Sequence, residues 1–363
     1  MTLTRTGALA GLAAASLLTL TACGSDNSTK ASNPSSGAST SADCAAGALS
    51  GAGSTFQQNI QQEWIKAYGS KCSGTQINYQ GTGSGAGIES FGNGTVDFAG
   101  SDAVMKPDEQ TKANGRCGGK AIHIPVTAGG VAVMYNLKGV EGLKLSAKTL
   151  AGIFQGTIKK WNDPAIAADN SGVKLPATTI TPYHRSDGSG TTKVFSGFLK
   201  DNAPAWKLGS DKSLTWPAGQ AAKGSDGVTA GVKQTDGGVT YVEVSFAKAN
   251  NLPTAMVKGA GSQFVAIDGK TVAAFLDTSF TATGSGNDLA GKLDFKGTSG
   301  YPISTVSYVI VCEKAKDAAK GKLLKGFLSY AVGDGQNAAD SLGFAALPTS
   351  IAAKAKASVQ ALS

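Results

Sequence analysis

The residues of this chain with the clearest chemical potential lie at positions 185–192, which read Arg-Ser-Asp-Gly-Ser-Gly-Thr-Thr. The guanidinium of Arg185 can present a fork of N–H donors to an oxyanion, and Asp187 is placed to hold that fork in position. Hydroxyl groups add donors, and glycines let the backbone approach a ligand closely. These residue types together indicate a site for a small oxyanion. The alternative is an ordinary helix that is capped by serine or threonine after a glycine turn.

The neighbouring residues place this segment at the start of a helix. Val194, Phe195, Phe198 and Leu199 have the spacing of one apolar helix face, and a strand is expected over residues 179–183. Unpaired backbone N–H groups and the helix dipole both favour negative charge at such an N-terminus.

Three other strand ends carry similar loops, at residues 51–55, 81–87 and 101–102. In parallel sheets, ligands bind at the carboxyl ends of strands, where helix N-termini converge. We therefore expect all four loops to surround one anion. The loop at 81–87 departs from G-x-G-x-x-G and lacks the lysine of a P-loop, which argues against a nucleotide.

Strands and helices alternate along the chain, which favours an α/β fold with mainly parallel sheets, two of them for this length. The expected strands are 76–80, 95–99, 122–125, 131–135, 179–183, 238–244 and 304–311. After the turn at 51–55, Phe56, Ile60, Trp64 and Tyr68 recur every four residues and predict one face of a helix. The other expected helices include 145–154, capped by Ser146, and also 315–331 and 350–362.

The N-terminal residues predict export and a lipid anchor. Arg5 precedes an apolar run over residues 8–20, which is too short to span a bilayer but has the length of a signal-peptide core. The run ends in Leu-Thr-Ala-Cys at Cys23, which resembles the bacterial lipobox. A secretory signal with an incidental cysteine is the alternative. Residues 24–41 are almost all small or polar and are typical of a flexible tether.

The cysteine count is consistent with an exported chain. There are five cysteines, and an odd number outside the cell normally leaves a free thiol. If Cys23 is acylated, Cys44, Cys72, Cys117 and Cys312 remain, and they can form two disulfide bonds in three ways. Zinc is disfavoured because no CxxC spacing exists and the two histidines lie far from any cysteine pair.

Composition narrows the class of partner. A hydrophobic content of 41% is that of a globular chain, and a net charge of +8 favours anionic partners through electrostatic steering. The lysines are scattered rather than clustered with aromatic residues, which argues against nucleic acid.

Several segments resemble the phosphate-binding lipoprotein of the bacterial high-affinity phosphate ABC transporter. The main ones are 51–56 (Gly-Ala-Gly-Ser-Thr-Phe), 78–85, 96–102 and 185–191, with lesser matches at 158–164, 238–243 and 301–303. The resemblance extends from about residue 48 to the C-terminus, and the cysteines and tether are closer to actinobacterial members. It implies a two-lobed periplasmic-binding-protein fold of type II, with two hinge crossings and a ligand cleft between the lobes.

The resemblance also implies which residues contact phosphate. They are Thr55, Phe56 through its backbone N–H, Ser84, Asp102, Arg185, Ser189, Gly190 and Thr191. Asp187 matches the residue that orients the arginine. His184 departs from those members that have arginine at its position. No catalytic residue, metal or cofactor is expected.

Asp102 carries a physical argument of its own. A carboxylate in an anion site is repulsive unless the ligand brings a proton to donate. Phosphate holds a proton near neutral pH and sulfate does not, so Asp102 favours phosphate over sulfate or molybdate. The alternative is that Asp102 only caps the turn toward Pro107.

The expected organisation follows from these observations. It comprises a lipoprotein signal peptide at 1–22, a tether at 23–46, lobe I at 47–128 and 300–363, and lobe II at 129–299. Hinge crossings are expected near 127–130 and 300–302, and the disulfide pairs as Cys72–Cys117 and Cys44–Cys312. The expected function is capture of inorganic phosphate outside the cytoplasmic membrane and delivery to ABC permease subunits by a monomer that is not an enzyme. A hydrolase of phosphate esters is the main alternative, although the chain has no G-x-S-x-G motif.

Overall fold

The computed structural model describes residues 44–363, and these belong to one compact unit. Cys23, the predicted signal peptide and most of the predicted tether lie outside the described residues. Among the residues described, no helix has both the length and the apolar character needed to cross a membrane.

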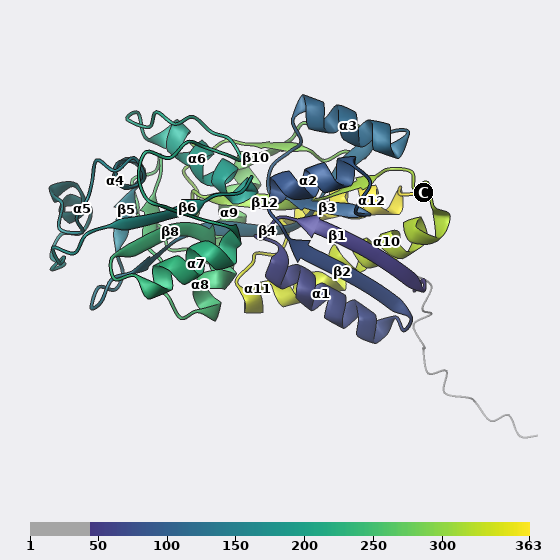
Figure 1. Cartoon of the computed structure of the whole chain (residues 1–363), viewed down its shortest axis with the longest axis horizontal. Helices are drawn as coiled ribbons and strands as arrows, with labels where there is room; N and C mark the ends of the chain where they lie inside the picture. Colours follow the sequence, from purple (N-terminus) through teal and green to yellow (C-terminus); the bar gives the residue numbers. More distant parts are fainter. Residues whose placement is uncertain (1–43) are drawn as a thin grey trace, which may run out of the picture. The chain divides into compact units, whose positions relative to one another are not determined.

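An eight-stranded sheet runs through the molecule in the order β2-β1-β3-β12-β4-β8-β6-β7 (Figure 1). Its strands are β1 (Gly47–Gly53), β2 (Thr75–Gly81), β3 (Phe98–Ser101), β4 (Ala121–Asn136), β6 (Thr181–Arg185), β7 (Gln220–Ala222), β8 (Gly238–Glu243) and β12 (Ser304–Cys312). At one end β1 pairs in parallel with β2 and β3, and at the other β6 pairs in parallel with β7 and β8. The three central pairings, of β12 with β3 and of β4 with β12 and β8, are antiparallel.

This sheet differs from the prediction of two mainly parallel sheets because of β4. Residues 122–125 and 131–135, expected as separate strands, belong to one continuous strand in which every residue before Asn136 is buried. Residues 121–130 of β4 pair with β12, and Val131–Asn136 pairs with β8. In a strand that is buried on both faces, apolar and polar residues do not alternate. The sequence pattern therefore does not show where such a strand begins and ends.

Most helices lie in two halves of the molecule, one on either side of β4 and β12 (Figure 1). The first half carries α1 (Gln58–Lys71), α2 (Ser84–Gly92), α3 (Pro107–Cys117), α10 (Ala318–Ala331) and α12 (Thr349–Gln360). The second half carries α4 (Ala147–Phe154), α5 (Pro164–Asp169), α6 (Gly190–Asn202), α7 (Gly224–Gln234) and α8 (Val244–Ala249). The predicted boundary between lobe I and lobe II, after residue 128, lies within β4. The lobe boundaries stay a prediction.

The smaller elements complete the chain. They are β5 (Lys144–Ser146), β9 (Met256–Lys258), α9 (Gly269–Ser279), β10 (Phe280–Ala282), β11 (Gly291–Leu293), η1 (Asp334–Ala338) and α11 (Ala339–Leu342). Two-stranded sheets form between β5 and β9 in parallel and between β10 and β11 in antiparallel fashion.

Two of the predicted helices, α1 and α4, have the local features that the sequence indicated. The predicted apolar face of α1 is buried at Ile60, Trp64 and Tyr68. The predicted cap of α4 is confirmed, because the side chain of Ser146 accepts a hydrogen bond from the backbone N–H of Thr149.

The predicted disulfide pairing is wrong. The bonds join Cys44 to Cys72 and Cys117 to Cys312. Cys44 and Cys72 each precede a strand by three residues, and the parallel register of Gly47 with Thr75 brings the two strand starts together.

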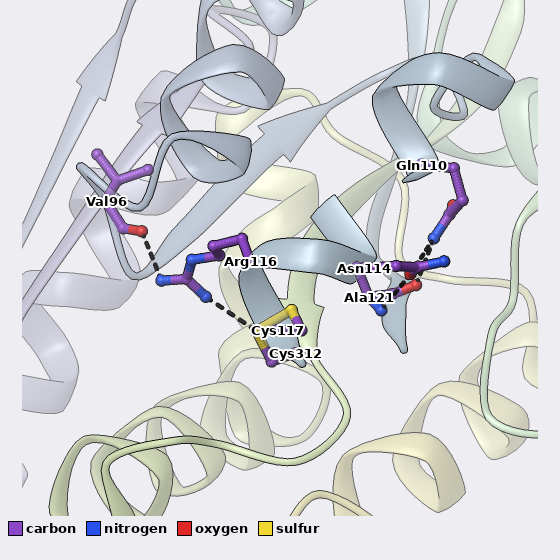
Figure 2. The surroundings of a disulfide bond; sticks show 7 residues. All are labelled: Val96, Gln110, Asn114, Arg116, Cys117, Ala121 and Cys312. Atoms are coloured by element: carbon purple, nitrogen blue, oxygen red, sulfur yellow. Dashed lines mark hydrogen bonds between the residues drawn. A yellow bond between two sulfur atoms is a disulfide. The ribbon is translucent and has the colours of Figure 1, made fainter. Parts of the chain in front are cut away.

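Strand register also accounts for the second bond. Cys117 ends α3 just before β4, and Cys312 ends β12 opposite Ala121, the first residue of β4. Figure 2 shows Arg116 beside this disulfide, donating from Nη1 to Cys312 Sγ at 2.8 Å and from Nη2 to the Val96 carbonyl at 3.0 Å. Pairing across neighbouring strands, rather than nearness in sequence, decides which cysteines meet.

Candidate functional site

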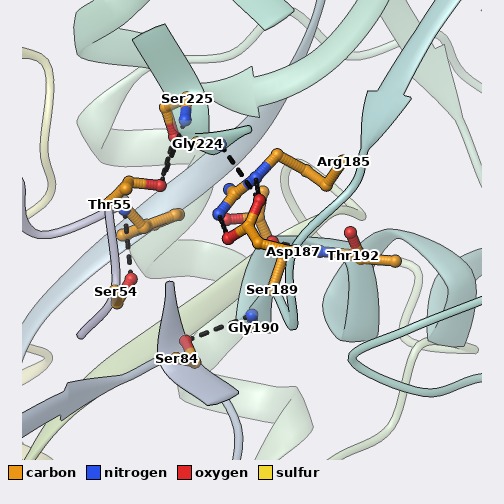
Figure 3. Close-up of polar contacts among 12 residues, drawn as sticks. Ser54, Thr55, Ser84, Arg185, Asp187, Ser189, Gly190, Thr192, Gly224 and Ser225 are labelled. Carbon is orange, nitrogen blue, oxygen red and sulfur yellow. Dashed lines mark hydrogen bonds and ion pairs between the residues drawn. The ribbon is translucent and has the colours of Figure 1, made fainter. Parts of the chain in front are cut away.

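The predicted site residues come together where the two halves of the molecule face each other. Figure 3 shows Thr55 and Ser84 from the first half opposite Arg185 and Gly190 from the second. The backbone N–H of Gly190 donates to Ser84 Oγ at 3.1 Å, and the Thr55 hydroxyl lies 2.8 Å from that of Ser225. All four loops singled out in the sequence therefore meet.

Three helices begin at this place. Ser84, Gly190 and Gly224 are the first residues of α2, α6 and α7. The unpaired N–H groups and positive dipole ends of helix N-termini favour a bound anion. At the start of α6, the Ser189 side chain caps the helix by accepting from the Thr192 N–H at 3.1 Å. The predicted helix N-terminus after residues 185–189 is confirmed.

Arg185 is held rigidly by Asp187. Arg185 Nε donates to Asp187 Oδ1 at 2.7 Å, Nη2 donates to Oδ2, and the Gly224 N–H also donates to Oδ1 at 3.0 Å. Burial would raise the pKa of Asp187, but the hydrogen bonds and charge of Arg185 hold that pKa below its usual value. The bonds to Asp187 use Nε and Nη2, so the N–H groups of Nη1 are left for another acceptor.

The second glycine loop passes very close to this ion pair. Gly83 has a φ of +92°, and a Cβ there would lie 2.2 Å from Asp187 Oδ2. Glycine is required by both the conformation and the space. Gly190 is equally confined, since its Cβ would lie 2.6 Å from both Ser84 Oγ and Asp102 Oδ2.

Asp102 lies in the centre of the site with 4% of its surface exposed. Its Oδ1 accepts from the hydroxyls of Ser54, at 2.6 Å, and Ser307. Its Oδ2 has a longer contact of 3.4 Å from the Thr191 hydroxyl. Burial raises the pKa of Asp102 above its ordinary value, while the bonds from Ser307 and Ser54 and the charge of Arg185 act in the opposite direction.

Several residues of this network were not predicted. Ser225 at the start of α7 donates its N–H to Thr55 Oγ1 at 3.2 Å, and the Tyr241 hydroxyl contacts both the Arg185 N–H and the Thr192 hydroxyl. Gly224 and Ser225 are a glycine and a serine at a helix N-terminus, as in the other loops, so the sequence could have indicated them. Ser307 was not, because it lies within an apolar strand.

Phe56 and His184 complete the set of predicted residues. The Phe56 side chain is fully buried, and its N–H donates to Ser54 Oγ at 3.1 Å. His184 stacks on Trp216 with ring centroids 5.0 Å apart, and burial lowers the pKa of its imidazole. The described residues contain no group of three or more histidine, cysteine, aspartate or glutamate side chains placed to hold a metal ion.

Comparisons with known proteins define the family. The model of the PBP superfamily domain matches residues 38–334. The chain is 39% identical over 374 aligned residues to the phosphate-binding protein PstS 3 of Mycobacterium tuberculosis strain H37Rv, with both chains covered in full. It is 40% identical over 377 residues to PstS 2 of the same strain, again in full.

Similarity extends to more distant bacteria and to solved structures. The chain is 35% identical to PstS of Xylella fastidiosa, over 84% of this chain and 82% of the relative. The phosphate-bound structure of the high-affinity periplasmic phosphate-binding protein PfluDING aligns with a TM-score of 0.71 at 25% identity, over 86% of this chain and 93% of that one. This solved relative shares the two-lobed fold that the sequence predicted. The chain belongs to the PBP superfamily and, within it, to the family of PstS phosphate-binding proteins.

Proposed function

We propose that this protein captures inorganic phosphate outside the cytoplasmic membrane and delivers it to an ABC permease without altering it chemically. The observation that carries the proposal is the buried carboxylate of Asp102 among three helix N-termini and an oriented arginine. Helix ends and Arg185 favour an anion, whereas Asp102 disfavours one that cannot donate a proton. Phosphate satisfies both conditions.

The proposed contacts combine both halves of the chain. Thr55, Phe56, Ser84 and Asp102 would meet the anion from one side, and Arg185 and the start of α6, at Ser189, Gly190 and Thr191, from the other. Closure by hinge motion at the two crossings would bury the ligand, since β4 continues from one half into the other. The names of the PstS relatives support phosphate as the ligand.

The hydrolase alternative has less support at this site. A hydrolase that uses a histidine base needs that base beside a nucleophilic hydroxyl. His123 uses both ring nitrogens, with Nε2 accepting from the Met105 N–H and Nδ1 contacting Asp288. His184 is stacked on Trp216. A binding protein rather than an enzyme is therefore the function that we propose.

The predicted lipid anchor and tether belong to the same proposal. Lipidation at Cys23 would anchor a monomer to the outer face of the membrane, with the residues before Cys44 as the tether. A Cys23→Ala variant should then appear in the soluble fraction after export, and mass spectrometry should find a diacylated Cys23 at the mature N-terminus of the wild type. An unmodified residue 1–22 segment in membrane-extracted protein would contradict the anchor.

Titration of two arginine variants tests the binding site. Arg185→Ala should weaken phosphate by at least about 10²-fold, because it removes charged hydrogen bonds and leaves Asp187 unpaired. Arg116→Ala, which removes the same charge beside the Cys117–Cys312 disulfide, is the matched control and should bind as the wild type does. Equal affinities for the two variants would refute the site. In cells that depend on this chain, uptake of radiolabelled phosphate should fall with Arg185→Ala.

A further inference from the structure

A buried chain of side-chain amides and hydroxyls leads to Asp102 from α1. Gln61 Nε2 donates to Gln57 Oε1 at 3.0 Å, and Gln57 Nε2 donates to Ser307 Oγ at 2.7 Å. The Ser307 hydroxyl then contacts Asp102 Oδ1. Gln57, Gln61 and Ser307 are each fully buried. Polar groups that are withdrawn from water to this extent are expensive unless their partners are well arranged.

A backbone carbonyl fixes which groups donate and which accept in this series of hydrogen bonds. Gln57 Nε2 also lies 2.6 Å from the Tyr308 carbonyl oxygen, which can only accept. The amide nitrogen of Gln57 must therefore face Ser307, so Ser307 Oγ accepts from Gln57. Its own proton is directed to Asp102 Oδ1, since its other acceptor, the Ser101 carbonyl, is 3.4 Å away.

The second hydroxyl on Asp102 is oriented by the same logic. Ser54 Oγ accepts the Phe56 N–H at 3.1 Å, so its proton points to Asp102 Oδ1 at 2.6 Å. Both hydroxyls are thus committed donors to a single carboxylate oxygen. Two O–H donors favour the charged form of the oxygen that receives them and so disfavour a proton on it. Oδ2 is left as the oxygen that can accept a proton from a ligand.

The pairing of β12 with β4 is irregular next to Ser307, where β4 holds one extra residue, Val126. The register with β4 shifts between Ser307, opposite Thr127, and Tyr308, opposite Pro125. Such shifts re-aim side chains and are frequent next to functional sites. Next to this irregularity, the Ser307 hydroxyl contacts Asp102, and the Tyr308 carbonyl accepts from Gln57.

We propose that Gln57, Ser307 and Ser54 are positioning residues that keep Asp102 an obligate acceptor and so set the selectivity of the site for a protonated oxyanion. The proposal rests on the proposed function, and it adds residues that act on the Asp102 carboxylate, directly or through Ser307, rather than on the anion. A structural role alone would require these groups to be paired. It would not require the Ser54 and Ser307 hydroxyls both to donate to Asp102 Oδ1.

The charges around Asp102 determine what loss of the hydroxyls would do. Arg185 favours the ionised carboxylate, Glu243 and burial oppose it, and Tyr79 faces it from β2. Removing a hydroxyl donor takes away one of the groups that stabilise the charge. Asp102 would then bind a proton at higher pH, and a neutral carboxylic acid can donate to sulfate.

The experiment compares phosphate and sulfate affinities from pH 5 to pH 8 for wild type, Ser307→Ala, Gln57→Met and Ser307→Thr. We expect Ser307→Ala and Gln57→Met to lower the phosphate-to-sulfate affinity ratio at pH 7 at least tenfold. Their sulfate binding should persist to higher pH than that of the wild type, and Ser307→Thr should restore the wild-type ratio. Ser196→Ala removes an equally buried hydroxyl that donates to the Lys193 carbonyl, and it should leave the ratio unchanged.

The outcomes separate this inference from the proposed function. A wild type that prefers phosphate, together with variants that keep its ratio and pH profile, would overturn the positioning role alone. A uniform weakening of both anions would also overturn it, because that is the effect of a merely structural loss. A wild type that binds no phosphate would instead refute the proposed function. Gln57→Met provides the selectivity readout if Ser307→Ala does not fold.

Discussion

Replacing Glu243 with glutamine should remove a pH dependence from the stability of this protein. Glu243 ends β8, and its side chain is fully buried. Its Oε2 accepts the Ser245 N–H at 2.9 Å and contacts the Ser245 hydroxyl, while Oε1 has no hydrogen-bond partner among the described residues. Burial raises the pKa of Glu243 to about 8, against the lowering effect of the bonds from Ser245.

The sign follows from proton counting. Between the ordinary pKa of 4.5 and about 8, the folded protein holds a proton that the unfolded chain has lost. The free energy of unfolding therefore falls as the pH rises through this window, and the stabilising contribution is complete only below the unfolded pKa. Because one pKa unit corresponds to about 1.4 kcal/mol, the loss between pH 5 and pH 8 is on the order of 3 kcal/mol.

Urea unfolding of the phosphate-free protein at pH 5 and pH 8 measures this difference. Glu243→Gln resembles the protonated side chain at every pH, so its stability relative to wild type should improve by an amount on the order of 3 kcal/mol from pH 5 to pH 8. Glu89→Gln, at an exposed position on α2, is the control and should follow the wild type. Parallel pH dependences for wild type and Glu243→Gln would show that Glu243 is ionised in the folded state.

Three further outcomes are expected. Asp102→Asn supplies an amide that can donate to either anion, so competition binding should show a loss of part of the preference for phosphate over sulfate; an unchanged ratio would contradict the role of Asp102. Gly190→Ala places a methyl group 2.6 Å from Ser84 Oγ and Asp102 Oδ2, and isothermal titration should show phosphate binding weakened at least about 10²-fold, or abolished, in a protein whose thermal unfolding is cooperative. Wild-type affinity would mean that α6 does not approach Asp102. Cys117→Ser with Cys312→Ser opens a loop of 195 residues in sequence separation and should cost about 5 kcal/mol of stability, against about 3.5 kcal/mol for Cys44→Ser with Cys72→Ser at a separation of 28. Denaturant unfolding of the two double variants tests that order, and the reverse order would contradict the chain-entropy account.

Local sequence was sufficient for the site loops and for several helices, among them α1, α4 and α6. The turn at 185–192 contains both the ligand-type residues and the capping pattern of α6, and Ser189 caps that helix as the pattern indicates. Ser146 and the buried face of α1 were predicted for the same reason. In each case the physical cause acts within a few residues, so a short segment contains all of the information.

Features that depend on pairing between distant strands were not predicted correctly or were missed. The disulfides are set by the register of β1 with β2 and of β4 with β12, which no local pattern encodes. The continuous strand β4 was divided because a doubly buried strand lacks alternation. Ser307 was missed because its contact with Asp102 depends on the pairing of β12 with β3, in which Tyr308 lies opposite Ser101.

Isothermal titration of the lipid-free wild-type chain with phosphate and then with sulfate at pH 7 is the most direct test of the central claim. The account predicts one saturable phosphate site and a preference over sulfate of at least about 10³-fold, because sulfate would leave the buried charge of Asp102 without a donor. Equal affinities would show that Asp102 does not accept a proton from the ligand. The absence of phosphate binding would contradict the account as a whole.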